Sequence, residues 1–126
     1  MMDGRPETLD LPETLIKVGY RARREDRLAD AQRYFADAVA LCRKGKDRAM
    51  LAQALTGMGQ IARDLNDHSA ALGRYKEAMS ICRSLDQPLQ LAHAIRHVGD
   101  ILRDMDRNVE AATQYVEALE DRKSVV

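Results

Sequence analysis

Tryptophan is absent from this sequence of 126 residues, and phenylalanine and tyrosine together make up only 4% of it. Proteins that hold single-stranded nucleic acid by base stacking need aromatic platforms, and this chain offers few. An excess of charge is also absent, because 20 basic and 20 acidic side chains cancel. Nucleic-acid-binding proteins usually carry a clear basic excess. We therefore expect no nucleic-acid partner.

Long apolar runs are lacking as well. No run approaches the roughly 20 residues that a helix needs to cross a membrane. The N-terminal segment MMDGRPETLDLPE has no apolar stretch of the kind found in secretory signals. These observations predict a protein that does not associate with membranes and that resides in the cytoplasm.

One pattern of small, apolar and aromatic residues occurs three times at a spacing of 40 residues. Each copy reads as two amphipathic helices joined by a turn. The copies are Leu15, Val18, Gly19, Ala22, Ala31, Phe35 and Ala38; Leu55, Met58, Gly59, Ala62, Ala71, Tyr75 and Ala78; and Ile95, Val98, Gly99, Leu102, Ala111, Tyr115 and Ala118. Self-similarity at one fixed period indicates an array of helical repeats that share a continuous core.

The glycines of this pattern fall inside otherwise good helices. Gly19, Gly59 and Gly99 each cost about 1 kcal/mol relative to alanine at such a position. Two helices approach closely only where their side chains are small, and a large residue one turn away fills the gap beside the crossing. Three glycines at one spacing therefore predict three close helix crossings.

In each copy seven positions follow one order: leucine or isoleucine, an apolar residue, glycine, alanine or leucine, alanine, an aromatic residue, and alanine. This order closely resembles the tetratricopeptide repeat. The resemblance covers about residues 12–122. The usual unit of that family has 34 residues, about six fewer than the period here. The longer period resembles the long-helix variety found in cargo-adaptor, polarity-scaffold and bacterial regulatory proteins. The resemblance implies an all-α, right-handed α-solenoid of three antiparallel helix-turn-helix repeats, and a non-catalytic protein-interaction function.

We expect a flexible leader over residues 1–11 and a single domain over 12–126, with repeats at about 12–51, 52–91 and 92–122. Six helices are predicted, over 12–25, 28–44, 47–64, 68–84, 88–104 and 108–122. Asp26, Asn66 and Asp106 follow the first helix of each repeat, and their side chains are predicted to cap the second helix. Gly45 and Pro88 are typical of a helix end and a helix start.

The two cysteines, Cys42 and Cys82, lie one repeat period apart at the ends of equivalent helices. A disulfide requires the two Cα atoms to lie within about 7 Å of each other. Helices one repeat apart are usually farther from each other than this. We expect two free thiols that serve as small core residues.

In the tetratricopeptide family the first helix of each repeat lines a concave groove, and partner peptides or helices usually lie there. Helical geometry identifies the face opposite the predicted core. This face with its rim holds the predicted partner-binding residues Glu13, Ile16, Tyr20, Arg23 and Arg24; Gln53, Thr56, Gln60, Arg63 and Asp64; and His93, Arg96, Asp100 and Arg103. The position on the other rim that repeats every 40 residues is occupied by Lys17, Gly57 and His97.

The arginines Arg23, Arg63 and Arg103 recur at the repeat period, and two interpretations stay open. Three guanidinium groups in register can bind carboxylates or peptide carbonyls of a partner, which favours a partner with acidic residues. Alternatively, each arginine complements the dipole at a helix end, and Asp64 and Asp104 neutralise neighbouring repeats. Under the first interpretation Tyr20, Arg63 and Arg96 act as binding anchors.

Other functions lack their residues. Family members that grip chaperone tails use lysine, asparagine and arginine where this chain has Ile16, Tyr20, Gly57, His93 and His97. His93 and His97 lie one turn apart, and Asp100 continues their stripe, but no convincing further ligand completes a metal site. Gly57-Met58-Gly59 lies within a helix and is no phosphate-binding loop. We predict no metal, no cofactor and no enzymatic activity.

The last repeat is ambiguous. Asp121-Arg122 replaces the apolar pairs Leu41-Cys42 and Ile81-Cys82, which indicates that the array ends here. Val116 and Leu119 nevertheless leave the last helix apolar. Either a second copy covers this face, which gives a homodimer through the last helices, or the chain is a fragment of a longer protein. Self-assembly through this face is therefore one alternative to a peptide-binding scaffold. A regulatory sensor that binds a small peptide in the groove is another.

Overall fold

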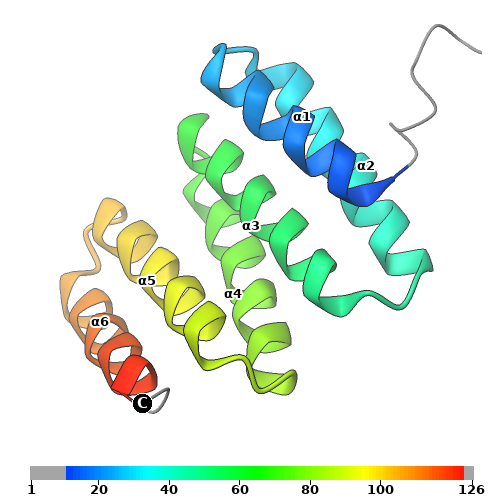
Figure 1. Ribbon diagram of the computed structural model, residues 1–126. Helices are drawn as coiled ribbons and strands as arrows, with labels where there is room; N and C mark the ends of the chain where they lie inside the picture. The colour runs from blue at the N-terminus through cyan, green and yellow to red at the C-terminus, as the bar shows by residue number, and fades with distance from the viewer. Residues whose placement is uncertain (1–10, 124–126) are drawn as a thin grey trace, which may run out of the picture.

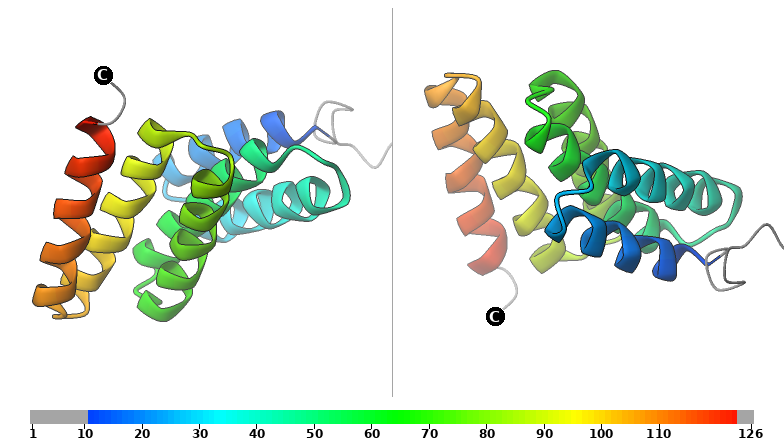
Figure 2. Two further views of the ribbon diagram at one scale, coloured as in Figure 1. Left: turned by 90° about the horizontal axis from the view of Figure 1, so that it is seen from below. Right: turned by 90° about the horizontal axis from the view of Figure 1, so that it is seen from above.

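The computed structural model describes residues 11–123, which form six α-helices and no strand. The helices are α1 (Pro12–Arg24), α2 (Leu28–Lys44), α3 (Arg48–Asp64), α4 (His68–Ser84), α5 (Pro88–Asp104) and α6 (Asn108–Lys123). They form three hairpins, α1–α2, α3–α4 and α5–α6, that stack in chain order (Figures 1 and 2). The predicted helix bounds agree with these to within about a residue. The leader, apart from residue 11, and the side chains of Asp121-Arg122 lie outside the described residues.

Each hairpin crosses at its glycine, as predicted. A Cβ atom added to Gly59 would lie 2.5 Å from the ring of Tyr75, and one added to Gly19 would lie 2.9 Å from the ring of Phe35. The third repeat has the same contact between Gly99 and its tyrosine. Because real Cβ atoms do not approach other atoms this closely, only glycine permits these helices to cross at this distance.

A second contact of the same rings joins one repeat to the next. A Cβ atom at Gly57 in α3 would lie 2.3 Å from the ring of Phe35 in α2. One repeat later, the ring of His97 in α5 stacks on Tyr75 in α4, with centroids 5.0 Å apart and an interplanar angle of 16°. Gly57 and His97 were expected on the groove rim, and the structure also gives them this packing role between repeats.

Ion pairs repeat between the hairpins along the odd-numbered helices. Arg23 in α1 donates from Nε to Asp64 Oδ2 in α3 at 2.6 Å, and Arg63 in α3 donates from Nε to Asp104 Oδ2 in α5 at 2.6 Å. Each arginine makes a second, longer bond to the other carboxylate oxygen. We call this series the inner ladder. It bears out the interpretation that Asp64 and Asp104 neutralise neighbouring repeats.

The even-numbered helices carry a second series, the outer ladder. Arg43 in α2 donates to Glu77 in α4 at 2.8 Å, and Arg83 in α4 donates to Glu117 in α6 at 2.6 Å. Exposed pairs of this kind contribute about 0.2–1 kcal/mol each. The two ladders therefore fix the register of stacking more than they raise stability.

The predicted helix caps are wrong in all three repeats. Asp26, Asn66 and Asp106 have φ angles of 59°, 62° and 62°, in the left-handed region. They end the preceding helix, since the next backbone N–H bonds back into it, as from Arg27 to the Ala22 carbonyl at 2.8 Å. Aspartate and asparagine tolerate this conformation better than other side chains, which explains their recurrence equally well.

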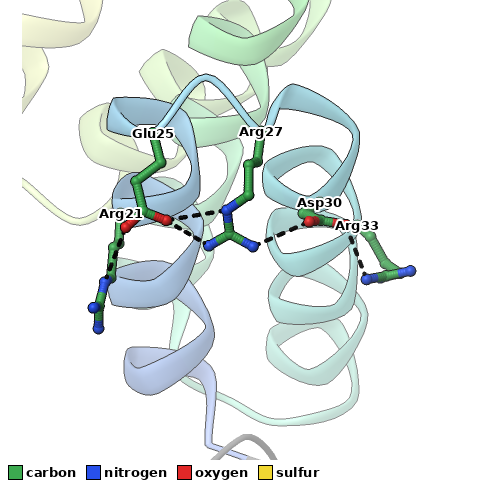
Figure 3. A network of polar contacts seen from close by, with 5 residues as sticks. All are labelled: Arg21, Glu25, Arg27, Asp30 and Arg33. Atoms are coloured by element: carbon green, nitrogen blue, oxygen red, sulfur yellow. Dashed lines mark hydrogen bonds and ion pairs between the residues drawn. The ribbon is translucent and has the colours of Figure 1, made fainter.

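The start of the second helix is secured by a side-chain cap in the second repeat and by arginine ion pairs in the first and third, where Arg107 donates to Glu110. Asp67 caps α4 by accepting from the N–H of Ala70 at 3.2 Å. In the first repeat, Arg27 instead joins the end of α1 to the start of α2 by donating to Glu25 and Asp30 (Figure 3). Gly45 ends α2 without a left-handed φ, and Pro88 begins α5 as predicted.

Both cysteines are buried free thiols, as predicted. Burial raises the pKa of Cys42 and Cys82, with small additions from Asp47 and Glu13 at the first. Both therefore stay protonated at neutral pH and act as core residues.

Within residues 11–123 no helix combines the length and the apolar character that crossing a membrane requires.

Candidate functional site

Two hollows lie side by side along the surface that α3 and α5 form. The first has a volume of about 670 Å³, and the second about 240 Å³. His97 lines both, so they are two parts of one groove. Helix α1 adds Arg23 to the first hollow and Tyr20 to the second. We call the two together the groove.

The groove gathers nine of the fourteen predicted partner-binding residues. Arg23, Gln60, Arg63, Asp64 and Asp100 line the first hollow, and Tyr20, Gln53, Thr56 and His93 line the second. Arg96 lines another hollow, between α5 and α6, which shares His93 with the second hollow of the groove. Glu13, Arg24 and Arg103 are exposed and line neither part of the groove.

Ile16 was predicted to face the groove, but only 7% of it is exposed, and it belongs to the core. Helix α1 contacts both α2 and α3, so its buried stripe is wider than a single hairpin contact requires. A helical wheel that assumes one neighbouring helix therefore predicts too narrow a buried face for α1. Ile16 stabilises the stack and is not accessible to a partner.

Sequence reasoning missed three residues of the first hollow, Asn66, His68 and Tyr75, whereas Asp104 was predicted on the groove face and lines this hollow. Tyr75 was assigned to the core, and it is indeed only 1% exposed. Tyr75 nevertheless lines the first hollow. The signal available in the sequence was the change from Phe35 in the first repeat to tyrosine in the second, since a core position gains nothing from a hydroxyl group.

In the first and third repeats, the aromatic residue contacts a groove residue that lies fifteen positions earlier. In the first repeat the ring of Tyr20 meets the ring of Phe35 edge-on, with centroids 4.9 Å apart and an angle of 77°. In the third repeat the hydroxyl group of Tyr115 donates a hydrogen bond to Asp100. Both of these pairs are satisfied, one by apolar contact and one by a hydrogen bond.

The equivalent pair in the middle repeat is not satisfied. The Tyr75 hydroxyl oxygen and Gln60 Oε1 are buried, and neither has a hydrogen-bond partner within the described part of the chain. Buried polar groups are nearly always paired, and an orphan costs about 1–3 kcal/mol. The first hollow is thus lined by two residues whose buried polar atoms lack a hydrogen-bond partner among the described residues.

The charges around this pair are largely balanced. Arg23 and Arg63 are held by Asp64 and Asp104, and these hydrogen bonds are the main reason that the pKa of each arginine is raised. Burial raises the pKa of Tyr75 to about 12, against the opposing effect of the two arginines. The hydroxyl group is therefore protonated at neutral pH and can donate.

His97 is neutral at neutral pH. Burial lowers its pKa, Arg96, His93 and Arg63 lower it further, and Asp100 opposes them. No three histidine, cysteine, aspartate or glutamate side chains among the described residues come together as metal ligands. The groove thus offers hydrogen-bonding groups and flat rings rather than a metal centre.

The lowered pKa of His97 predicts a pH dependence of stability. Below about pH 6.5, the ordinary value, the unfolded chain binds a proton that the folded chain does not, so stability is lost as the pH falls toward the folded pKa. Replacing His97 by phenylalanine keeps a ring against Tyr75 and removes the titration. Chemical denaturation between pH 7 and 5 should show a smaller loss of stability for His97→Phe than for the wild type. Equal slopes in the two proteins would contradict this assignment.

A stack of antiparallel helix hairpins, with glycine crossings and a groove along one set of helices, defines the class of α-helical repeat proteins. The sequence pattern of the tetratricopeptide repeat family matches residues 10–84. The chain belongs to this family. A search of curated protein sequences finds no matching relative.

Solved structures share the fold. Aspartyl phosphate phosphatase F from Bacillus subtilis superposes with a TM-score of 0.87 at 13% identity, over 96% of this chain and 32% of its own. BtubC from P. vanneervenii gives 0.85 at 14% identity, over 90% of this chain and 47% of its own. The TPR domain of Arabidopsis FLU gives 0.83 at 16% identity, over 94% of this chain and 99% of its own. This chain thus spans less than half of the first two proteins.

Proposed function

We propose that this protein is a non-catalytic scaffold that binds an extended peptide segment of a partner protein in the groove. The observation that carries the proposal is the unsatisfied pair of Tyr75 and Gln60 in the first hollow of the groove. Membership of a family whose members are generally interaction scaffolds supports it. A cytoplasmic location remains part of the proposal on the composition of the chain alone.

The chemistry of the pair suits a main-chain amide. The Tyr75 hydroxyl group can donate to a peptide carbonyl, and Gln60 Oε1 can accept from a peptide N–H. The groove is preformed by packed helices, so little ordering is required on binding. We do not extend the proposal to an acidic partner, because Arg23 and Arg63 already bind aspartates of this chain.

Selection of peptides from a displayed random library tests this proposal. Gln53→Arg places a long charged side chain at the second hollow and should reduce the affinity of selected peptides at least about tenfold, equivalent to 1.4 kcal/mol. Gln32→Arg makes the same change on α2, which contributes no residue to either hollow, and should have no effect. Failure to select any peptide, or equal effects of the two changes, would reject the proposal.

Two other functions have some support. Val116 and Leu119 are 60% and 53% exposed, which favours self-assembly through α6. If the protein sediments as a monomer at all concentrations, that function is excluded.

The volume of the first hollow is within the range of small-ligand sites, which favours a sensor of a small peptide. Binding of di- and tripeptides, detected as a rise in melting temperature, would support the sensor.

A further inference from the structure

Among residues 11–123, no helix covers the outward face of the third repeat as α3 and α5 cover the same face of the first two repeats. Phe35 and Tyr75 are 0% and 1% exposed because α3 and α5 lie over them. Tyr115, at the same position, is only partly buried. Leu119 is 53% exposed, whereas its equivalent Val39 is 7% exposed.

The inner ladder also stops at this face. Arg23 and Arg63 each bind an aspartate of the following repeat, at 2.6 Å. Arg103 is the next member of the series, and its side chain is 58% exposed. Within the described part of the chain, Arg103 pairs only with Asp100 of its own helix, at 3.9 Å. Arg103 thus presents a positive charge at the position where the two earlier arginines bind a neighbouring helix.

The two helices that cover equivalent faces share one arrangement of residues. In α3, Gly57 contacts the aromatic ring and Asp64 binds the arginine. In α5, His97 contacts the ring and Asp104 binds the arginine. Each pair is seven residues apart, which is two helical turns, so both members face the same way.

We propose that this outward face, which we call the end face, docks an amphipathic helix of a partner protein. Its main contacts are Arg103, Tyr115 and Leu119, beside a hollow of about 240 Å³ that Arg96 and Ala118 also line. The docking helix carries glycine or histidine over Tyr115 and, seven residues later, an aspartate that binds Arg103. Charge and shape at the end face thus specify the partner together.

A second copy stacked head to tail does not have this chemistry. Its α1 would bring Lys17 over Tyr115 and Arg24 opposite Arg103, because these residues occupy the positions of Gly57 and Asp64. Two guanidinium groups would then face each other where the inner ladder pairs opposite charges. The end face therefore selects against α1 of this chain and favours a helix of the α3 or α5 type.

A synthetic peptide with the sequence of α5, residues 88–104, is a suitable probe because it carries His97 and Asp104 at the required spacing. Titration of the labelled peptide with the full chain, followed by fluorescence anisotropy, should show saturable binding. The peptide change Asp104→Arg and the protein change Arg103→Glu should each weaken binding about tenfold or more. Combining the two changes should restore binding. A peptide of α1, residues 12–24, is the matched control and should not bind.

Three results would overturn the proposal. The first is the absence of saturable binding of the α5 peptide. The second is binding that Arg103→Glu leaves unchanged. The third is a concentration-dependent dimer that Leu119→Glu abolishes and that the α5 peptide does not displace, since the end face would then belong to a second copy. Because Arg103 and Leu119 are exposed, circular dichroism should show that both variants fold.

Discussion

Replacing Gly57 by alanine should lower the free energy of unfolding by roughly 1–3 kcal/mol, although alanine is the better helix former by about 1 kcal/mol. The added Cβ atom would lie 2.3–2.7 Å from three atoms of the Phe35 ring. That ring is completely buried and is also in contact with Gly19, so it has no free space to move into. Either the ring or the helix must shift, and the contact between the first two repeats loosens.

Gly73→Ala is the matched control, because the same change is made in a helix where a Cβ atom meets nothing within 4 Å. Its stability should rise by about 1 kcal/mol. Urea denaturation of both variants measures the difference directly. Equal stabilities of Gly57→Ala and Gly73→Ala would show that the helices do not depend on a close approach at Gly57.

Tyr75→Phe should raise stability by roughly 1 kcal/mol and reduce peptide affinity by about tenfold. Removal of the hydroxyl group relieves a buried polar atom that has no partner within the described residues. The ring keeps its contacts with Gly59 and His97. The same change removes the proposed donor to the peptide carbonyl, so stability and binding move in opposite directions, as at functional sites that store strain.

Tyr115→Phe is the control for this second prediction. Its hydroxyl group donates to Asp100, so its loss should lower stability by about 0.5–1.5 kcal/mol and leave peptide affinity close to the wild-type value. Thermal or urea denaturation gives the stabilities, and titration with a selected peptide gives the affinities. A loss of stability in Tyr75→Phe, or an unchanged affinity, would remove the case for Tyr75 as a binding residue.

The fold was predictable because its determinants recur. Gly19, Gly59 and Gly99 stand at one spacing with an aromatic residue at a fixed distance, and no other common arrangement explains three such costs. The helix bounds followed from the same periodicity. The turns were assigned wrongly, because Asp26 and its equivalents are favoured both as caps and in the left-handed conformation that ends a helix. The sequence alone does not distinguish these two roles.

The groove was predictable only in part. A helical wheel places side chains around one helix, but Ile16 is buried by contacts with two neighbours. Arg23 and Arg63 pair with aspartates of the following repeat, and a wheel drawn for one helix holds no information on how the repeats stack. The role of the Tyr75 hydroxyl group required the knowledge that no side chain of residues 11–123 bonds to it. Contacts between repeats account for the burial of Ile16 and for the paired arginines, whereas the unpaired Tyr75 hydroxyl group is a feature of the second repeat itself.

The ring signals of the histidines test the central claim most directly. The chain has only three histidines, and all of them line the groove: His68 and His97 in the first hollow, and His93 and His97 in the second. In a two-dimensional proton–nitrogen NMR spectrum of the imidazole rings, saturation with a selected peptide should shift His97 most strongly. A saturating peptide that leaves all three rings unmoved would show that partners bind elsewhere.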